Sequence, residues 1–248
     1  MLGIIGGTGL TQLSNLEVTR REVVRTPYGE PSGALTFGRI AGREVVFLAR
    51  HGYGHTIPPH MVNYRANIWA LHAQQLTRVV SVASVGGIRD DLGPGVIAVP
   101  DQIVDYTWGR RSTYHEGEDR AVVHIDFTYP YSESLRQEIL GAARDVGQDM
   151  IDGGVYATTQ GPRLETAAEI DRLERDGAHM VGMTGMPEAA LARELDLNYA
   201  AIAVVANYAA GRAGSKAGIR MEDINATLRT ALAKVRNVIE RLVESHAD

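Results

Sequence analysis

Hydrophobic residues along this chain follow strand and helix patterns in alternation. Short apolar runs predict buried strands at residues 2–5, 78–87, 179–183 and 198–211, and residues 93–105 predict further strand. Residues 22–52 predict three strands joined by turns, with a tight hairpin at "AGRE".

Helices are predicted from apolar residues that recur every three or four positions. This spacing occurs at residues 63–76, 131–146 and 166–176, and another helix is expected to begin near Pro187. The clearest helix is the last one, with apolar residues at Met221, Ile224, Leu228, Leu232, Val235, Ile239 and Leu242. Because strands and helices alternate, we expect an α/β fold. We predict one domain spanning residues 1–248, with a mixed, barrel-like central sheet flanked by helices.

Composition and charge exclude several classes of protein. The chain has 25 basic and 30 acidic residues, and this net charge of −5 disfavours general binding to nucleic acid. It contains no cysteine, which rules out disulfides, zinc–thiolate sites and thiol nucleophiles. No apolar run approaches the roughly 20 residues of a membrane span. The N-terminus does not resemble a signal peptide, so we expect a cytoplasmic protein without a membrane partner.

The opening "MLGIIGGTGL" poses the first chemical question. A dinucleotide fingerprint needs a third glycine that is missing here, and a Walker A loop needs a Gly-Lys-Ser/Thr sequence that is also missing. What remains is a strand followed by Gly6, Gly7, Thr8 and Gly9, whose backbone N–H groups can form an anion-receptive loop. A tight turn under packed strands explains the glycines equally well.

A second candidate segment is "LARHGYGHTIPPHMVNYRANIWAL". Arg50 and His51 end an apolar strand, where an arginine can grip an oxyanion with two parallel hydrogen bonds. His51, His55 and His60 invite a metal site, but glycines and prolines between them prevent a helix that would align them, and no carboxylate is near in sequence. A loop over a pocket is the better interpretation, and no metal is expected.

Two further segments end in polar residues. Ser84 ends a buried strand before two glycines, and the same pattern is typical of a β-bulge. Glu165 and Thr184 each precede a predicted helix, where a carboxylate or hydroxyl also serves as a cap. Asn207 ends an apolar strand, and its amide must find partners.

Together these segments resemble a known family. "GIIGGTGL", "LARHG…HTIPP…VNYRANIWAL", "GPRLET", "MTGMPEAALARE" and "ANYAAG" are similar, in the same order, to nucleoside phosphorylases of the 5′-methylthioadenosine phosphorylase type. Such enzymes split the N-glycosidic bond of a purine nucleoside with inorganic phosphate. The resemblance implies a nucleoside and phosphate as small-molecule partners, phosphate as a co-substrate, and no metal or organic cofactor.

The resemblance also implies roles for individual residues. Phosphate would be bound by Thr8, Arg50, His51, Ala83, Ser84 and Thr184. Family members often have a hydroxyl residue where Ala83 stands, so a contact from Ala83 would come through its backbone N–H. Met183 would line the ribose, and Asn207, Glu165 and His51 are the expected catalytic residues. Phosphate beneath C1′ would stabilise positive charge on the sugar as the base departs.

The base pocket departs from the adenine-specific pattern. Adenine-specific relatives carry aspartates at the positions of Asn207 and Ala209 and a small hydroxyl residue at that of Glu165; this chain instead resembles phosphorylases of 6-oxopurines. The asparagine NH2 can donate to O6, its carbonyl can accept from a protonated N7, and an ionised Glu165 can accept from N1–H. Adenine N1 has a lone pair, which a carboxylate would repel.

The 5′ side and the oligomeric state also follow from the comparison with the family. Enzymes for inosine place a histidine near the 5′-hydroxyl, whereas here Met221 and Ile224 occupy the matching helix start, unless they are simple core residues. An apolar wall favours a methylthio group. We therefore expect 5′-methylthioinosine as substrate and hypoxanthine and 5-methylthioribose 1-phosphate as products. The family forms trimers, and His124 matches a histidine that reaches into the neighbouring site, with a buried structural role as the alternative.

Four other functions stay open at this point. The same fold and phosphate site suit a 5′-methylthioadenosine phosphorylase, and the same base pocket suits an inosine/guanosine phosphorylase. A nucleosidase, which uses water, would not need Arg50 and Thr184 as anion ligands. A purine-binding sensor module would bind nucleoside and phosphate without turnover.

Overall fold

Strand β5 (Arg78–Gly87) lies at the centre of the fold, where it pairs with β1 (Leu2–Gly6), β10 (Met180–Gly182) and β11 (Asn198–Tyr208). The computed structural model describes residues 1–10, 13–117 and 121–245. The remaining strands are β2 (Glu17–Glu22), β3 (Leu35–Ile40), β4 (Arg43–Ala49), β6 (Ile97–Val99), β7 (Gln102–Asp105), β8 (Ile151–Asp152) and β9 (Val155–Thr158). The helices are α1 (Tyr64–His72), α2 (Glu133–Asp145), α3 (Ala167–Arg175), α4 (Gly185–Glu194) and α5 (Met221–Glu244), with short 3-10 turns at Pro59–Met61 and Ala213–Ser215.

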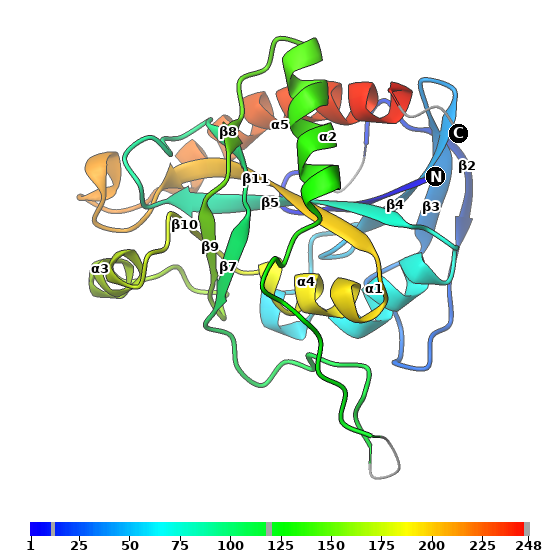
Figure 1. The fold of residues 1–248 in the computed structure, drawn as a ribbon. Helices are drawn as coiled ribbons and strands as arrows, with labels where there is room; N and C mark the ends of the chain where they lie inside the picture. Colours follow the sequence, from blue (N-terminus) through cyan, green and yellow to red (C-terminus); the bar gives the residue numbers. More distant parts are fainter. Residues whose placement is uncertain (11–12, 118–120, 246–248) are drawn as a thin grey trace.

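The sheet is mixed and forks at β5. Its main path runs β2-β3-β4-β1-β5-β10-β9-β7, and a branch runs from β5 through β11 and β6 to β8. Strands β4, β1, β5 and β11 are parallel, so their carboxyl ends meet at one edge, whereas β10 runs antiparallel to β5. The sheet curves but does not close, which confirms the expected α/β fold with a mixed, barrel-like sheet and flanking helices (Figure 1).

Helices cover both faces of the sheet because successive strand residues point to opposite sides. Ile4 packs into the core beneath α2 and α5, whereas its neighbour Ile5 packs into the core beneath α1 and α4. In Figure 1, α2 and α5 lie together on one side of β5 and β11, and α1 and α4 lie on the other. Helix α3 packs beside β10, against a smaller cluster of buried residues.

Most predicted elements agree with the structure, and one is misplaced. Strand β5 and helix α5 coincide with the apolar runs that predicted them, and the β3–β4 hairpin turns at Ala41 and Gly42, both with positive φ. Of the three strands predicted within residues 22–52, only β3 and β4 lie there. The third, β2, comes earlier, and every one of its residues is exposed. A strand with no buried face carries no hydrophobic alternation, so periodicity could not locate it.

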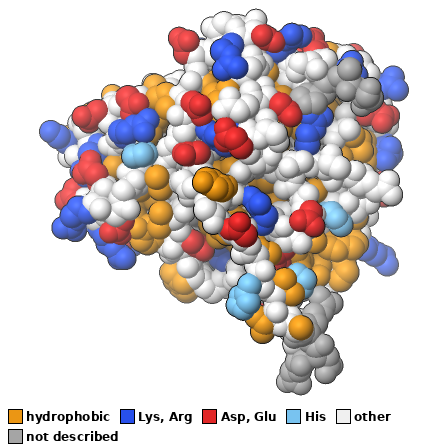
Figure 2. All heavy atoms as spheres, in the orientation of Figure 1, with side chains coloured by type: hydrophobic (Ala, Val, Ile, Leu, Met, Phe, Trp, Pro, Cys, Tyr) orange, Lys and Arg blue, Asp and Glu red, His pale blue; other side chains and the backbone are white. Residues whose placement is uncertain are grey.

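The surface is mixed in charge. On the face shown in Figure 2, basic and acidic side chains are interspersed rather than segregated into a basic face. Within the described residues, no helix is both long and apolar enough to span a bilayer.

Helix α5 provides the first testable prediction. Ile239 is fully buried in the core that joins α5 to α2 and the sheet. We expect Ile239→Ala to lower the free energy of unfolding by about 2–5 kcal/mol, the usual cost of truncating a buried isoleucine. Urea unfolding followed by circular dichroism would measure it, with Asn237→Ala on the exposed face of the same helix as control. An equal effect of both substitutions would contradict this packing.

Candidate active site

A cavity of about 520 Å³ opens at the carboxyl edge of the parallel strands. Ligands bind at this edge in open α/β sheets, where neighbouring strands diverge. Strand β5 pairs with β1 through Ser81 and with β10 only from Gly86 onward, so in the described structure residues 82–85 have no strand partner on this side. The fork therefore leaves room for a ligand beside the edge of β5 at residues 82–85, where no neighbouring strand pairs with its backbone.

The cavity brings together eleven of the thirteen residues predicted from sequence. They are Thr8, Arg50, His51, Ala83, Ser84, Glu165, Met183, Thr184, Asn207, Met221 and Ile224. These residues lie on or next to β1, β4, β5, β10, β11, α3, α4 and α5, so half of the described strands and helices contribute to one site.

Two predicted residues lie elsewhere. Ala209 is buried, its N–H donates to the Gly87 carbonyl, and it packs with the cluster beneath α3 instead of lining the cavity. Ala209 thus lies beside β5 just beyond the end of β11, and in the described structure it does not reach this cavity. His124 is exposed on the segment between β7 and α2 and does not line this chain's cavity, so it is not the buried structural histidine considered as an alternative.

Arg50 is held by a buried network that the sequence did not reveal. Its Nε and Nη2 donate to the two carboxylate oxygens of Glu188 at 2.7 and 2.9 Å. Nη2 also donates to Ser81 Oγ at 2.5 Å, and Nη1 donates to the Val82 carbonyl at 3.1 Å. Four of the five guanidinium hydrogens are thus used, and one on Nη1 remains. The expected two-pronged grip on an oxyanion is therefore wrong for this arginine, because Glu188 occupies the fork.

Glu188 is fully satisfied as well. It accepts hydrogen bonds from Ser81 and from the Tyr199 hydroxyl, each at 2.8 Å. Burial alone would raise the pKa of Glu188, but the Arg50 charge and these hydrogen bonds outweigh it, so the pKa lies below its ordinary value. Burial likewise disfavours the charged form of Arg50, yet the adjacent carboxylate raises its pKa overall.

The opening loop passes directly beside this arginine. A Cβ on Gly7 would lie 2.8 Å from Arg50 Nη1 and 2.6 Å from the Val82 carbonyl, so only glycine permits the contact. The chain then turns at Gly9, with φ of +79°, and Leu10 N–H closes the turn on the Gly7 carbonyl. Thr8 lies at the tip of this turn and lines the cavity. The loop is both a tight turn and part of the cavity wall, so the two interpretations are compatible.

His51 is buried in its neutral form. Burial, followed by the charge of Arg50, lowers the pKa of His51 to about 4. Its Nδ1 lies 2.8 Å from the Ile57 carbonyl, so Nδ1 carries the hydrogen and Nε2 is left as an acceptor. The His55 ring packs against that of His51 in a tilted arrangement, with centroids 4.8 Å apart, and the loop from His55 to Pro59 lines the cavity. Within the described residues, no group of three or more His, Asp or Glu side chains is arranged to hold a metal ion.

The end of β5 presents backbone donors to the cavity. In an extended strand, the N–H and C=O of one residue point to the same edge and those of the next residue to the other. Because the Val82 carbonyl faces Arg50, the N–H of Ser84 lies on the open edge and that of Ala83 faces β11. Ser84 is therefore the donor here, and the expected contact through the Ala83 N–H is not supported.

A β-bulge brings Asn207 to the cavity. The register between β5 and β11 shifts between Val205 and Asn207, so that Asn207 pairs with Gly86 and Ala206 is the extra residue. Bulges next to active sites re-aim side chains, and both Ala206 and Asn207 line the cavity. Asn207 Nδ2 donates one hydrogen to the Tyr208 carbonyl at 2.6 Å, which leaves its second N–H and its Oδ1 for a ligand.

Neither Glu165 nor Thr184 caps a helix through its side chain, although Thr184 occupies the N-cap position of α4. Thr166 and Glu169 form a reciprocal capping box at the start of α3, so the carboxylate that caps this helix belongs to Glu169. Glu165 instead accepts a hydrogen bond from Thr159 Oγ1 at 2.6 Å. Thr184 precedes α4 without a side-chain cap bond and is buried at the cavity wall. The sequence had left both capping interpretations open.

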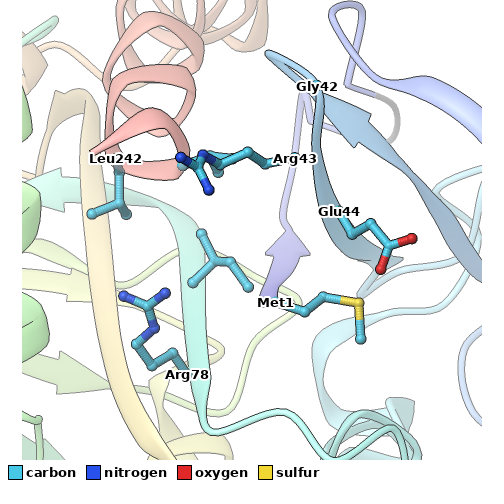
Figure 3. A pocket seen from close by; sticks show the side chains of 8 residues that line it. Met1, Gly42, Arg43, Glu44, Arg78 and Leu242 are labelled. Atoms are coloured by element: carbon cyan, nitrogen blue, oxygen red, sulfur yellow. The ribbon is translucent and has the colours of Figure 1, made fainter. Parts of the chain in front are cut away.

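Another cavity lies at the opposite, amino-terminal ends of the same strands. It has a volume of about 300 Å³ and is lined by Arg43 and Arg78 among others (Figure 3). Arg78 is paired with Glu138 at 3.1 Å. None of the residues predicted to carry chemistry lies there.

Known proteins match this chain over nearly its full length. The family model described as the phosphorylase superfamily matches residues 1–244. A probable S-methyl-5′-thioinosine phosphorylase of Pseudomonas syringae pv. tomato is 54% identical over 242 residues, covering 98% of each chain. A 6-oxopurine nucleoside phosphorylase of Pyrococcus furiosus is 46% identical over 220 residues, covering 87% of this chain and 82% of its own. The structure of methylthioadenosine phosphorylase from Schistosoma mansoni with adenine superposes with a TM-score of 0.93 at 32% identity, covering 98% of this chain and 90% of its own.

The Arg50–Glu188 pair generates the second prediction. Glu188→Gln should lower the free energy of unfolding by about 3–5 kcal/mol, because it leaves a buried guanidinium without its counter-charge. Since the folded-state pKa of Glu188 is lowered, its contribution is present above the ordinary value of 4.5 and is lost as the pH falls through the folded-state value. The wild type should therefore lose more stability in acid than the variant.

Urea unfolding at several pH values measures both effects. Glu22→Gln is the matched control, because Glu22 pairs with Arg20 on the surface and should contribute no more than about 1 kcal/mol. If Glu188→Gln costs no more than this control, the buried pair does not stabilise the site.

Proposed function

This chain belongs to the phosphorylase superfamily, and we propose that it cleaves S-methyl-5′-thioinosine with inorganic phosphate to give hypoxanthine and 5-methylthio-α-D-ribose 1-phosphate. The proposal rests on one observation: a single cavity joins anion donors, a carboxylate–amide pair and an apolar wall. The relatives described above are named for this reaction or for one of two related phosphorylase activities, on 6-oxopurine nucleosides and on methylthioadenosine.

Phosphate is the co-substrate in this proposal, and no other cofactor is invoked. Thr8, Arg50, Ser84 and Thr184 all line the cavity, and we assign to phosphate the two hydroxyls, the remaining Arg50 hydrogen and the Ser84 N–H. His51 Nε2 is an acceptor and can accept a hydrogen bond from a phosphate hydroxyl. A phosphate oxygen forms the new bond to C1′ as the C1′–N9 bond breaks, and the electron pair of that bond leaves with the purine. The bound phosphate is thereby aligned for attack and faces the developing positive charge.

The base would be recognised by Glu165 and Asn207. Glu165 presents a carboxylate oxygen to N1–H of a 6-oxopurine, and the free Asn207 N–H reaches O6. The Asn207 N–H that donates to O6 stabilises the negative charge that develops on the leaving base, and Asn207 Oδ1 accepts from N7 once solvent has protonated it. A buried site built for such hydrogen bonds can reject an analogue that lacks them by roughly 10⁴–10⁵.

The 5′ side favours a methylthio group over a hydroxyl. Met221 and Ile224 line the cavity at the start of α5, so they are not core residues alone. Ile224 is buried, whereas Met221 is 60% exposed and able to adapt to a ligand. A 6-oxopurine nucleoside phosphorylase is the second candidate, favoured by the Pyrococcus furiosus relative, and it differs at this wall.

We also propose a homotrimer in which His124 reaches the cavity of a neighbouring copy. The segment between β7 and α2 extends away from the sheet, as Figure 1 shows. It carries exposed apolar side chains, with Val122 at 78% and Tyr129 at 72% exposure. Surfaces of this kind mark contacts between proteins. Analytical ultracentrifugation gives the oligomeric state, and a monomer at micromolar concentration would contradict this part of the proposal.

The third prediction concerns substrates. With phosphate present, methylthioinosine should be converted at least tenfold more efficiently than methylthioadenosine, inosine or adenosine, as expected from at least one mispaired buried group. Product identification by chromatography should show hypoxanthine and the sugar 1-phosphate. Turnover without phosphate would indicate a nucleosidase, binding without turnover a sensor module, and preference for methylthioadenosine would overturn the base assignment.

The fourth prediction concerns Asn207. Asn207→Asp removes the N–H that would reach O6, and its charge opposes the developing charge on the base. We expect kcat for methylthioinosine to fall by roughly 10²–10³, the usual cost of losing one such donor. Asn237→Asp on the exposed face of α5 is the control. If Asn207→Asp retains the wild-type rate, Asn207 does not recognise the base.

A further inference from the structure

Thr159 links Glu165, which lines the cavity, to the end of β10, which leads into the cavity-lining residues Met183 and Thr184. It directly follows β9 and donates from Oγ1 to Glu165 Oε1 at 2.6 Å. The same Oγ1 lies 3.3 Å from the Gly182 carbonyl. A threonine hydroxyl has one hydrogen, and the shorter contact to a carboxylate takes it. Thr159 therefore occupies one oxygen of Glu165 and leaves Oε2, which has no hydrogen-bond partner among the described residues, for a ligand.

Thr159 is itself fixed by the ends of neighbouring strands. Its backbone N–H donates to the Gly182 carbonyl at 2.8 Å, and its carbonyl accepts from Arg110 Nη2 at 3.3 Å. Gly182 ends β10, which pairs with β9 and leads directly into Met183 and Thr184 (Figure 1). The position of the Glu165 carboxylate is therefore set relative to the segment that would face ribose and phosphate.

We propose that Thr159 is a positioning residue that sets the preference for 6-oxopurines over 6-aminopurines by fixing the orientation of the Glu165 carboxylate. The inference rests on the proposed function. A fixed carboxylate accepts from N1–H of a 6-oxopurine without further loss of side-chain freedom. The same fixed carboxylate cannot turn away from the N1 lone pair of adenine, so the repulsion persists. The Thr159 hydroxyl thus favours binding of 6-oxopurines and also disfavours binding of adenine.

Thr159→Val tests this proposal because valine keeps the shape and removes the hydroxyl. With phosphate saturating, we expect the ratio of kcat/KM for methylthioinosine to that for methylthioadenosine to fall about tenfold, the size of one hydrogen bond to a charged group. The value of kcat/KM should fall for methylthioinosine and should not fall for methylthioadenosine, because a mobile carboxylate can turn away from the N1 lone pair of adenine. KM for phosphate should stay at its wild-type value. Thr159→Ser, which restores the hydroxyl, should recover most of the ratio.

Thr158→Val is the matched control. Thr158 is the preceding residue and is fully buried, but its Oγ1 has no hydrogen-bond partner within the described part of the chain. This substitution removes the same group from the same strand end and should leave the substrate ratio unchanged. Thermal unfolding of each variant reports on folding, and Thr159→Ala replaces the valine variant if that variant does not fold.

The results separate this proposal from the one on which it rests. A wild type that prefers methylthioadenosine would overturn the proposed function before any variant is compared. If the wild type prefers methylthioinosine and Thr159→Val keeps the substrate ratio within twofold, the positioning role is wrong and the function stands. An equal loss of kcat/KM for both nucleosides would also overturn the positioning role, because the Thr159 hydroxyl would then only support the structure of the site.

Discussion

The buried pair of Arg50 and Glu188 is the constraint on which the site depends. Removing two charges from water is costly unless each is compensated and fully hydrogen-bonded. Here the partners come from four elements: Arg50 follows β4, Glu188 lies on α4, Ser81 and Val82 lie on β5, and Tyr199 lies on β11. Gly7 after β1 then packs against the guanidinium, where no side chain fits. The ion pair thus fixes the strand ends that surround the cavity.

This arrangement makes the part of the cavity beside Arg50 and His51 nearly neutral. Glu188 balances the charge of Arg50, and a pKa of about 4 leaves His51 uncharged at pH 7. Under the proposed function, phosphate would be held by hydrogen bonds rather than by excess positive charge. Its own negative charge would then remain available to stabilise the sugar cation as the glycosidic bond breaks. The negative charge of phosphate would thus not be neutralised by the protein before it faces the sugar cation.

Two irregularities of the sheet, a fork and a β-bulge, open the cavity and orient Asn207 toward it. The fork leaves residues 82–85 of β5 without a strand partner on one edge, and the bulge at Ala206 brings Asn207 to the same opening. Thr159 and Glu165 approach from β9 and α3 on the far side. The two groups proposed to recognise the base therefore come from separate branches of the sheet.

The sequence by itself determined the local elements and the candidate residues. Apolar periodicity located α5 and β5, and ordered motifs identified eleven of the residues that line the cavity, because both signals lie in contiguous residues. Only the tertiary structure decided how those residues are supported. Arg50 and Glu188 are 138 positions apart, and a glutamate in an apolar helix carries no sign of its partner. Strand β2 escaped prediction for another reason, because a strand with no buried face carries no hydrophobic alternation. The pairing of Ala209 with Gly87 and the contact of Thr159 with Glu165, six positions away, depend on how distant segments pack around them. That packing is set by the free energy of the whole fold rather than by neighbours in sequence.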